Sequence, residues 1–280
     1  MTVPGLIALD IDGTVTDFGG VIPPEVVAYL SELVSDGWNV VFITGRTFTD
    51  GFKILQPLSF PYYFAVQNGA ITLRMPQQEV VAKHTLGTDV FPAMENICKD
   101  EPSDFVIFAG FEHQDCCYYR SHCFSKELLE YLKARSDAFN SIWYDVESFD
   151  NLTLANFPSL KCFGQVESAS RISYRIENEI GLHAPLIKDP FQNGYYVVQA
   201  THASVNKGSA LRDLKQRLRV QTPVIAAGDD NNDISMLEEA DIRIIMVTAP
   251  DHLLQTATII APPAREKGII QGLQKALNLI

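Results

Sequence analysis

Apolar residues along this chain gather in short runs, each followed by a polar or glycine turn and then by a segment with apolar positions at helical spacing. These runs predict strands at residues 6–9, 40–43, 62–66 and 224–227. Helices are predicted at 24–36, 211–218 and 234–240, and residues 70–73 are predicted to turn back as a hairpin after Asn68-Gly69. Strands that alternate with helices are typical of a parallel sheet covered by helices.

The middle of the chain has its own mixture of strands and helices. Between residues 83 and 190, helices are predicted at 90–98, 126–136 and 170–180, and strands at 105–109, 116–120 and 161–166. The parallel-sheet pattern is predicted to resume at 195–199. We therefore expect a discontinuous α/β domain, residues 1–82 and 191–280, interrupted by an inserted α+β domain at 83–190.

Composition and charge exclude several classes of partner. The chain has 280 residues, 46% of them hydrophobic, and its 22 Lys and Arg against 34 Asp and Glu give a formal net charge of -12. An acidic surface repels phosphate backbones and anionic lipids, and no run rich in Lys or Arg is visible. The longest apolar runs are shorter than the ~20 residues of a membrane helix. We expect neither nucleic acid nor a membrane as a partner.

Cysteine usage and the first residues bear on location. The five cysteines are odd in number and form no C-x-x-C pair or zinc-binding spacing, so we interpret them as reduced thiols. The first 17 residues lack a basic segment and carry Asp10, Asp12 and Asp17 where a secretion signal is apolar. These features predict a cytoplasmic protein. We expect it to be a monomer or a weak homo-oligomer.

Polar side chains follow the predicted strands of the α/β domain. Asp10 and Asp12 follow the first strand, Thr44 the second, and Asp229 and Asp233 the strand at 224–227. Ligands bind at the carboxyl ends of strands in open α/β sheets, so these groups should meet at one rim. Clustered carboxylates repel one another unless a cation lies among them, and hard oxygen ligands suit Mg²⁺. A rim of this kind can perform phosphoryl transfer.

Each of these residues also has an ordinary structural interpretation. Asp before Gly13-Thr14 can be simple turn chemistry, Asp233 can complement a helix dipole, and Thr44 can cap a helix. Lys207 stands at a helix start, where the dipole disfavours a cation, and this suggests an anion to neutralise. A solvated surface lysine is the alternative.

The four segments together resemble the motifs of haloacid dehalogenase-like hydrolases. LIALDIDGTVTD is similar to the first motif, VVFITGR to the second, VNKGSAL to the third and VIAAGDDNNDISML to the fourth, in the order of the family. A large insert between the second and third motifs is typical of the Cof-type phosphatase branch. The resemblance implies a Rossmann-like three-layer core with a mostly parallel sheet and an inserted α+β cap.

The resemblance also implies roles for the acids. Asp10 would attack phosphorus and form an aspartyl-phosphate, and Asp12 would serve as general acid and base. Mg²⁺ would be held by Asp10, the backbone carbonyl of Asp12 and Asp229, with Asp233 on its waters or on Lys207.

A second set of residues would hold the substrate. Thr44 and Lys207 would bind the phosphoryl oxygens together with the backbone N–H of Gly45. Arg46 would face either the cap or the substrate, and Asn232 would support the fourth loop or touch substrate. These positions complete the candidate site implied by the resemblance.

The inserted region would close over the core as a cap and determine specificity. It contains a polar and aromatic stretch suited to hydrogen bonding with a sugar, formed by His113, Tyr118, Tyr119, Arg120 and His122. The alternative is that these are ordinary strand and loop residues.

Three functions are compatible with these motifs. The favoured one is a Mg²⁺-dependent phosphatase acting on a small phosphorylated metabolite, such as a sugar phosphate. A phosphomutase similar to phosphomannomutase would use the same aspartyl-phosphate, and a non-catalytic sensor of phosphorylated ligands would keep only the fold. Asp10 and Asp12 are both present, which favours an enzyme.

Overall fold

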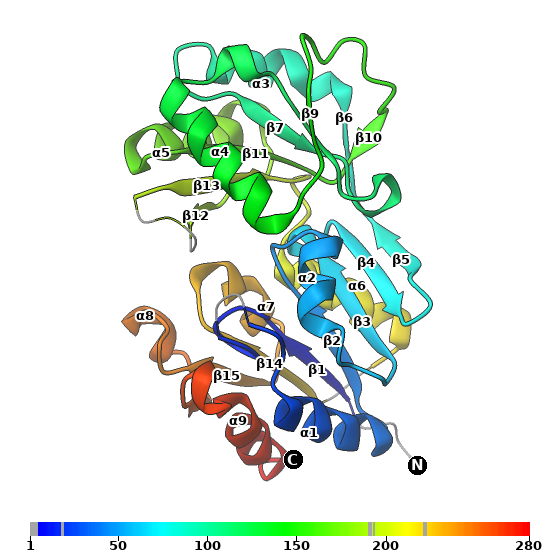
Figure 1. Cartoon of the computed structure of the whole chain (residues 1–280). Coiled ribbons are helices and arrows are strands. Elements are labelled where there is room, and N and C mark those ends of the chain that lie inside the picture. The colour runs from blue at the N-terminus through cyan, green and yellow to red at the C-terminus, as the bar shows by residue number, and fades with distance from the viewer. Residues whose placement is uncertain (1–4, 18–19, 190–191, 193, 221–222) are drawn as a thin grey trace. The chain divides into compact units, whose positions relative to one another are not determined.

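The computed structural model describes residues 5–17, 20–189, 192, 194–220 and 223–280. The chain divides into two compact units (Figure 1). The first, here called the core, comprises Met1–Arg46, Asp50–Lys83 and Asn206–Ile280. The second, here called the cap, comprises Thr47–Thr49 and His84–Val205.

The core contains an eight-stranded sheet in the order β16-β15-β14-β1-β2-β3-β4-β5. Its strands are β1 (Leu6–Leu9), β2 (Asn39–Ile43), β3 (Tyr62–Val66), β4 (Ile71–Met75), β5 (Glu79–Lys83), β14 (Val224–Gly228), β15 (Ile242–Met246) and β16 (Ile259–Ala261). Pairing is parallel from β16 to β3, whereas β4 and β5 are antiparallel. All residues of β1 and β14 are buried, as expected for strands covered on both faces.

Helices cover both faces of the core sheet (Figure 1). They are α1 (Pro24–Ser35), α2 (Phe48–Leu55), α6 (Lys207–Leu218), α7 (Ile234–Glu238), α8 (Asp251–Leu254) and α9 (Gly268–Leu277). Leu211 of α6 and Met236 of α7 pack against Leu6 and Val41 of the sheet. Helices α1 and α9 contact each other and lie on the other face. The predicted α/β class with a mostly parallel sheet is therefore confirmed, and so is the hairpin of β3 and β4.

The cap is built on a six-stranded sheet in the order β12-β13-β11-β7-β8-β9. Its strands are β7 (Phe105–Phe108), β8 (Cys117–Tyr119), β9 (Trp143–Asp145), β11 (Ser159–Gly164), β12 (Leu186–Lys188) and β13 (Tyr196–Ala200), and a separate pair is formed by β6 (Leu86–Gly87) and β10 (Asn156–Phe157). Only β8 and β9 pair in parallel within this sheet as described.

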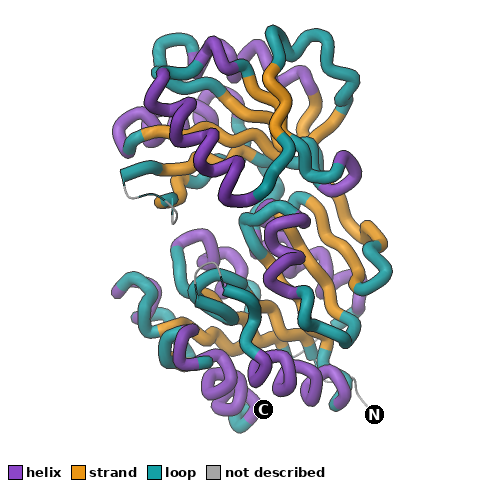
Figure 2. Tube along the Cα trace, viewed as in Figure 1, coloured by secondary structure: helices purple, strands orange, loops and turns teal. Residues whose placement is uncertain are grey.

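Helices lie on both faces of the cap sheet (Figure 2). Phe105 and Ile107 pack with α3 (Phe91–Cys98) and α5 (Val166–Arg175), whereas Val106 and Phe108 pack with α4 (Lys126–Phe139). Successive side chains of β7 point to opposite faces of the sheet, so this strand contributes to two separate apolar clusters.

One prediction was wrong. The strand expected to resume the parallel sheet is β13, and it instead lies between β11 and β12 in the antiparallel cap sheet. The predicted boundary at 190/191 falls on residues outside the described ones, and the cap unit continues to Val205. An apolar run predicts a buried strand but carries no information about which strands it pairs with.

Among the residues that the structure describes, no helix combines the length and the apolar character that crossing a membrane requires.

Candidate active site

The candidate site begins where neighbouring parallel strands of the core end. Asp10 directly follows β1, and its backbone N–H donates to the carbonyl of Ala227 at 3.0 Å. Asp229 directly follows β14, the neighbour of β1 on one side, and Thr44 follows β2, the neighbour on the other side (Figure 1). The sheet order thus brings these strand ends to one edge.

Lys207 joins two of the acids in the interior. Its Nζ donates to Oδ1 of Asp10 at 2.5 Å and to Oδ1 of Asp233 at 2.6 Å. Lys207 is 1% exposed, Asp10 5% and Asp233 0%. A single cation between two buried carboxylates leaves a net negative charge, which is costly in an environment of low polarity.

The first turn of α6 explains how a lysine comes to be buried there. Asn206 and Ser209 form reciprocal side-chain to backbone hydrogen bonds that cap the helix. Gly208 follows Lys207, and a Cβ at this position would lie 2.2 Å from the carbonyl oxygen of Ser235. The close approach that glycine permits therefore holds the first turn of α6 against the start of α7.

Asp233 organises the loop after β14. Its Oδ2 accepts hydrogen bonds from the backbone N–H of Asp229 at 2.9 Å and of Asp230 at 3.0 Å, while its Oδ1 binds Lys207. Both oxygens of Asp233 are thus engaged by the protein. Of the two roles predicted for it, the contact with Lys207 is the one seen.

The electrostatics of this cluster favour a bound cation. Burial raises the pKa of Asp10 well above its usual range, Lys207 opposes this effect, and the charge of Asp233 adds to it. Burial, followed by the charge of Asp233, raises the pKa of Asp229 to about 7. Carboxylate oxygens of Asp10, Asp229 and Asp233 lie within 4.8 Å of one another. These hard oxygen donors, with negative charge in excess, fit a divalent cation such as Mg²⁺.

Thr14 is a member of the site that sequence reasoning missed. Its Oγ1 donates to Oδ1 of Asp229 at 3.2 Å. The preceding Gly13 has φ 78°, and a Cβ there would lie 2.1 Å from Oδ2 of Asp229. The Gly-Thr pair therefore leaves room for the carboxylate of Asp229 and orients it, a role that the turn motif alone does not reveal.

Asp12 forms a bidentate ion pair with Arg46. Nε of Arg46 donates to Oδ2 of Asp12 at 2.6 Å, and Nη2 donates to Oδ1 at 2.7 Å. Arg46 was expected to face cap or substrate, and here both of these donors are occupied by Asp12. Sequence reasoning missed the pairing because the two residues belong to separate motifs.

A strained turn supports the loop that carries Thr44. The backbone N–H of Asn68 donates to the carbonyl of Thr44, and that of Gln67 to the carbonyl of Arg46, both at 2.8 Å. Gln67 and Asn68 have φ 51° and 58°, a region that side chains other than glycine rarely adopt. Gly45 lies between these two braced carbonyls.

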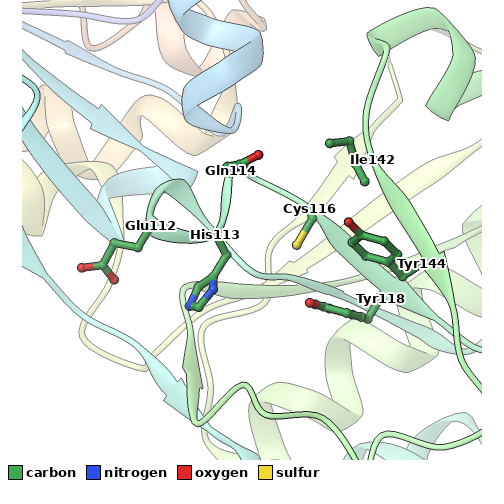
Figure 3. A pocket seen from close by; sticks show the side chains of 7 residues that line it. All are labelled: Glu112, His113, Gln114, Cys116, Tyr118, Ile142 and Tyr144. Carbon is green, nitrogen blue, oxygen red and sulfur yellow. The ribbon is translucent and has the colours of Figure 1, made fainter.

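The remaining predicted residues are dispersed. Asn232 is half-buried beside Asp233, and none of the hydrogen bonds between the described acids and Lys207 includes it. In the cap, Tyr119 packs against Phe124 and Trp143, whereas Arg120 pairs with Asp104 and Glu95. His122 is exposed. His113 and Tyr118 of that stretch line a common pocket of the cap together with Tyr144, here called the tyrosine pocket (Figure 3).

Comparisons with known proteins agree with this geometry. The family model described as haloacid dehalogenase-like hydrolase matches residues 7–273. The chain is similar to the 5-amino-6-(5-phospho-D-ribitylamino)uracil phosphatase YitU of Bacillus subtilis, with 25% identity over 99% of each chain. Its fold is similar to a haloacid dehalogenase-like hydrolase from Bacteroides thetaiotaomicron, with TM-score 0.79, 17% identity and coverage of 98% and 99% of the two chains. It also resembles the subclass IIB sugar phosphatase BT4131, with TM-score 0.73, 19% identity and coverage of 99% and 100%.

Proposed function

Since the chain belongs to the haloacid dehalogenase-like hydrolases, we propose that it is a Mg²⁺-dependent phosphatase that hydrolyses a small phosphorylated metabolite, specifically a sugar phosphate. The observation that carries this proposal is the buried cluster of Asp10, Lys207 and Asp233 beside Asp229 at the ends of β1 and β14. Phosphate monoesters react very slowly in water, so their hydrolysis requires charged groups that converge in this way.

In the first step, Asp10 attacks phosphorus. Lys207 holds Oδ1 of Asp10, which leaves Oδ2 as the nucleophile. The new bond joins Oδ2 to phosphorus while the bond from phosphorus to the alkoxide oxygen breaks. Asp12 protonates the departing alkoxide, so that an alcohol leaves and Asp10 carries the phosphoryl group.

In the second step, the aspartyl-phosphate is hydrolysed. Asp12, now a carboxylate, takes a proton from a water molecule whose oxygen attacks phosphorus. The bond between Oδ2 and phosphorus breaks, inorganic phosphate is released, and the carboxylate of Asp10 is restored. Thr44 and Lys207, with the backbone N–H of Gly45, would hold the phosphoryl oxygens in both steps.

Arg46 is proposed to keep Asp12 in position before substrate arrives. The guanidinium donors that bind the two oxygens of Asp12 can bind two phosphoryl oxygens equally well. An incoming phosphate ester therefore competes for Arg46 and frees Asp12 for proton transfer.

Asp10, Asp229 and the backbone carbonyl of Asp12 would hold Mg²⁺, and Asp233 would act through Lys207 and the loop backbone. When bound, the ion would neutralise the repulsion between the nucleophile and the phosphoryl oxygens. The raised pKa of Asp229, about 7, is consistent with a carboxylate that lacks a sufficient counter-charge in the metal-free protein.

The variant Asp10→Asn tests the proposal. It should release no phosphate from p-nitrophenyl phosphate in the presence of Mg²⁺, because an amide cannot act as the nucleophile, and it should retain the circular dichroism spectrum of the wild type. The exposed Asp36 provides a matched control, and Asp36→Asn should retain full activity. Undiminished turnover by Asp10→Asn would rule out the mechanism.

A further inference from the structure

A short turn of the core contacts both the loop of Thr44 and the helix that begins at Lys207. It consists of Gln67–Gly69, directly after β3, and we call it the 67–69 turn. Strand β3 pairs in parallel with β2, which ends just before Thr44, so the turn lies at the same edge of the sheet as that residue. The turn, the Thr44 loop and the start of α6 all belong to the same compact unit.

On one side, the turn fixes the direction of a peptide group. The backbone N–H of Asn68 donates to the carbonyl oxygen of Thr44 at 2.8 Å. A peptide bond is planar and trans, so the carbonyl of Thr44 and the N–H of Gly45 point in opposite directions. The hydrogen bond from Asn68 therefore directs the N–H of Gly45 away from the turn. The N–H of Gln67 holds the carbonyl of Arg46 at 2.8 Å, so the loop is fixed on both sides of Gly45.

On the other side, Gly69 lies directly against the start of α6. It has φ 99°, and a Cβ at this position would lie 2.5 Å from Cβ of Ala210 and 3.2 Å from the carbonyl oxygen of Asn206. Both distances are shorter than an ordinary contact of ~3.5–4 Å, so the approach requires glycine. Because Asn206 immediately precedes Lys207, this contact joins the turn to the helix start that carries the buried cation.

The turn is held by its backbone rather than by its side chains. Gln67 and Asn68 are 0% and 2% exposed, and their φ angles are 51° and 58°. Within the described ranges, none of the four polar side-chain atoms of these two residues has a hydrogen-bond partner. Successive left-handed residues and buried amides without partners both destabilise a fold, and such costs concentrate at functional positions.

We propose that the 67–69 turn is a positioning element of the phosphoryl site. Through Asn68 it orients the N–H of Gly45 beside Thr44, and through Gly69 it holds them at a fixed separation from Lys207. Affinity for a phosphoryl group therefore depends on the left-handed backbone of Asn68 and on the contact of Gly69 with α6. This inference rests on the proposed function, which assigns the phosphoryl oxygens to Thr44, Gly45 and Lys207.

Binding of inorganic phosphate in the presence of Mg²⁺, measured by titration calorimetry on the full chain, tests the role of Asn68. A β-branched residue is disfavoured at positive φ, so Asn68→Val should raise Kd about 5-fold. Asn68→Gly removes the amide but adopts this conformation freely, and its Kd should stay within about 2-fold of the wild type. Ile269→Val weakens the packing of α9, remote from the turn, and controls for lost stability. Equal Kd values for Asn68→Val and Asn68→Gly would overturn the inference.

A compensating pair of substitutions tests the contact with α6. Gly69→Ala places a methyl group against Ala210 and should raise Kd for phosphate about 10-fold. The double variant Gly69→Ala/Ala210→Gly removes the opposing methyl, so Kd should return to within about 3-fold of the wild type. Ala210→Gly alone lowers helix propensity, so a general loss of stability would not be reversed by it. The same Kd with and without Ala210→Gly in the Gly69→Ala protein would contradict the positioning role.

Phosphate binding and phosphate release separate this inference from the proposed function. Kd values that change as expected in the variants, without hydrolysis of any ester by the wild type, would refute the phosphatase and retain the positioning role. Hydrolysis by the wild type with unchanged Kd in Asn68→Val and Gly69→Ala would do the reverse. A wild-type protein that binds no phosphate would overturn the positioning role.

Discussion

The core site and the tyrosine pocket differ in charge and in burial. Lys207 and Asp233 are almost completely enclosed, and the site carries more acids than cations. In the tyrosine pocket, Tyr144 is 49% exposed and no lining residue is Lys or Arg. Buried charges interact strongly with a phosphoryl group, because their surroundings are less polar than water. The contrast separates buried, charged groups in the core from neutral, partly exposed groups in the cap.

The largest effect on stability is expected from a substitution of Lys207, the buried cation of the core site. Lys207→Met leaves Asp10 and Asp233 buried without their cation, and the free energy of unfolding should fall by about 3–5 kcal/mol. Urea unfolding followed by circular dichroism measures the change. Adding Asp10→Asn should recover part of the loss, because it removes one of the two unpaired charges. The exposed Lys275 gives the control Lys275→Met, with a change below about 0.5 kcal/mol.

A smaller effect, on rate, is expected at Arg46. Arg46→Lys keeps the charge but loses the two-point contact with Asp12, so kcat should fall about 10- to 100-fold for an alkyl phosphate, whose leaving group needs a proton. p-Nitrophenyl phosphate, with its good leaving group, should lose less than 10-fold. Arg74→Lys alters an exposed arginine that pairs with Glu79 and serves as the control. Equal losses on both substrates would show that Arg46 does not act through Asp12.

The effect of Mg²⁺ on folding stability should depend on pH, because Asp229 in the core site has a raised pKa. Below the ordinary pKa of 3.8 both the folded and the unfolded chain carry the proton of Asp229, but between 3.8 and about 7 only the folded protein retains it. The stability of the metal-free protein should therefore fall as pH rises through this window. Mg²⁺ binds the ionised form, so it should raise Tm by several degrees at pH 8 and by less at pH 5 in scanning calorimetry. Asp229→Asn should abolish the difference, and its persistence in that variant would assign it to other groups.

The smallest effect is expected in the turn that braces the Thr44 loop. Asn68 has φ 58°, so Asn68→Ala should cost about 1 kcal/mol of unfolding free energy, whereas Asn68→Gly should change it by less than about 0.5 kcal/mol. Urea unfolding compares the two variants. Equal stability of the alanine and glycine variants would show that the left-handed conformation carries no strain.

The core strands β1, β2, β3 and β14 were predictable because each is a short apolar run that ends at a polar turn, whereas β5, β15 and β16 were not predicted. Asp10 and Asp229 could therefore be assigned to strand ends from the sequence, and the parallel order of β1 and β14 brings those ends together. The strand β13 was assigned to the wrong sheet, because a buried strand looks alike whether it pairs in parallel or antiparallel fashion. A local pattern of apolar residues predicts whether a segment is a strand or a helix. It does not predict which other strands that strand will pair with.

The contacts within the site show the same division. The motifs identified Asp12 and Arg46 as candidates, yet no spacing indicated that they pair with each other. The sequence offered only a turn as the interpretation of Gly13-Thr14, although the hydroxyl of Thr14 donates a hydrogen bond to Asp229. The support that Gln67 and Asn68 give to the Thr44 loop depends on backbone groups, which every residue carries and no sequence pattern distinguishes.

The amino-acid sequence alone determined which chemical groups this protein carries and the order in which they follow its strands, because apolar periodicity and turn residues act over a few neighbouring positions. The folded chain decided which of those groups meet. Lys207 and Asp10 lie 197 positions apart and come within 2.5 Å only because α6 returns to the end of β1. Ion pairs and hydrogen bonds form across space, so the partner of each charge depends on how the elements pack.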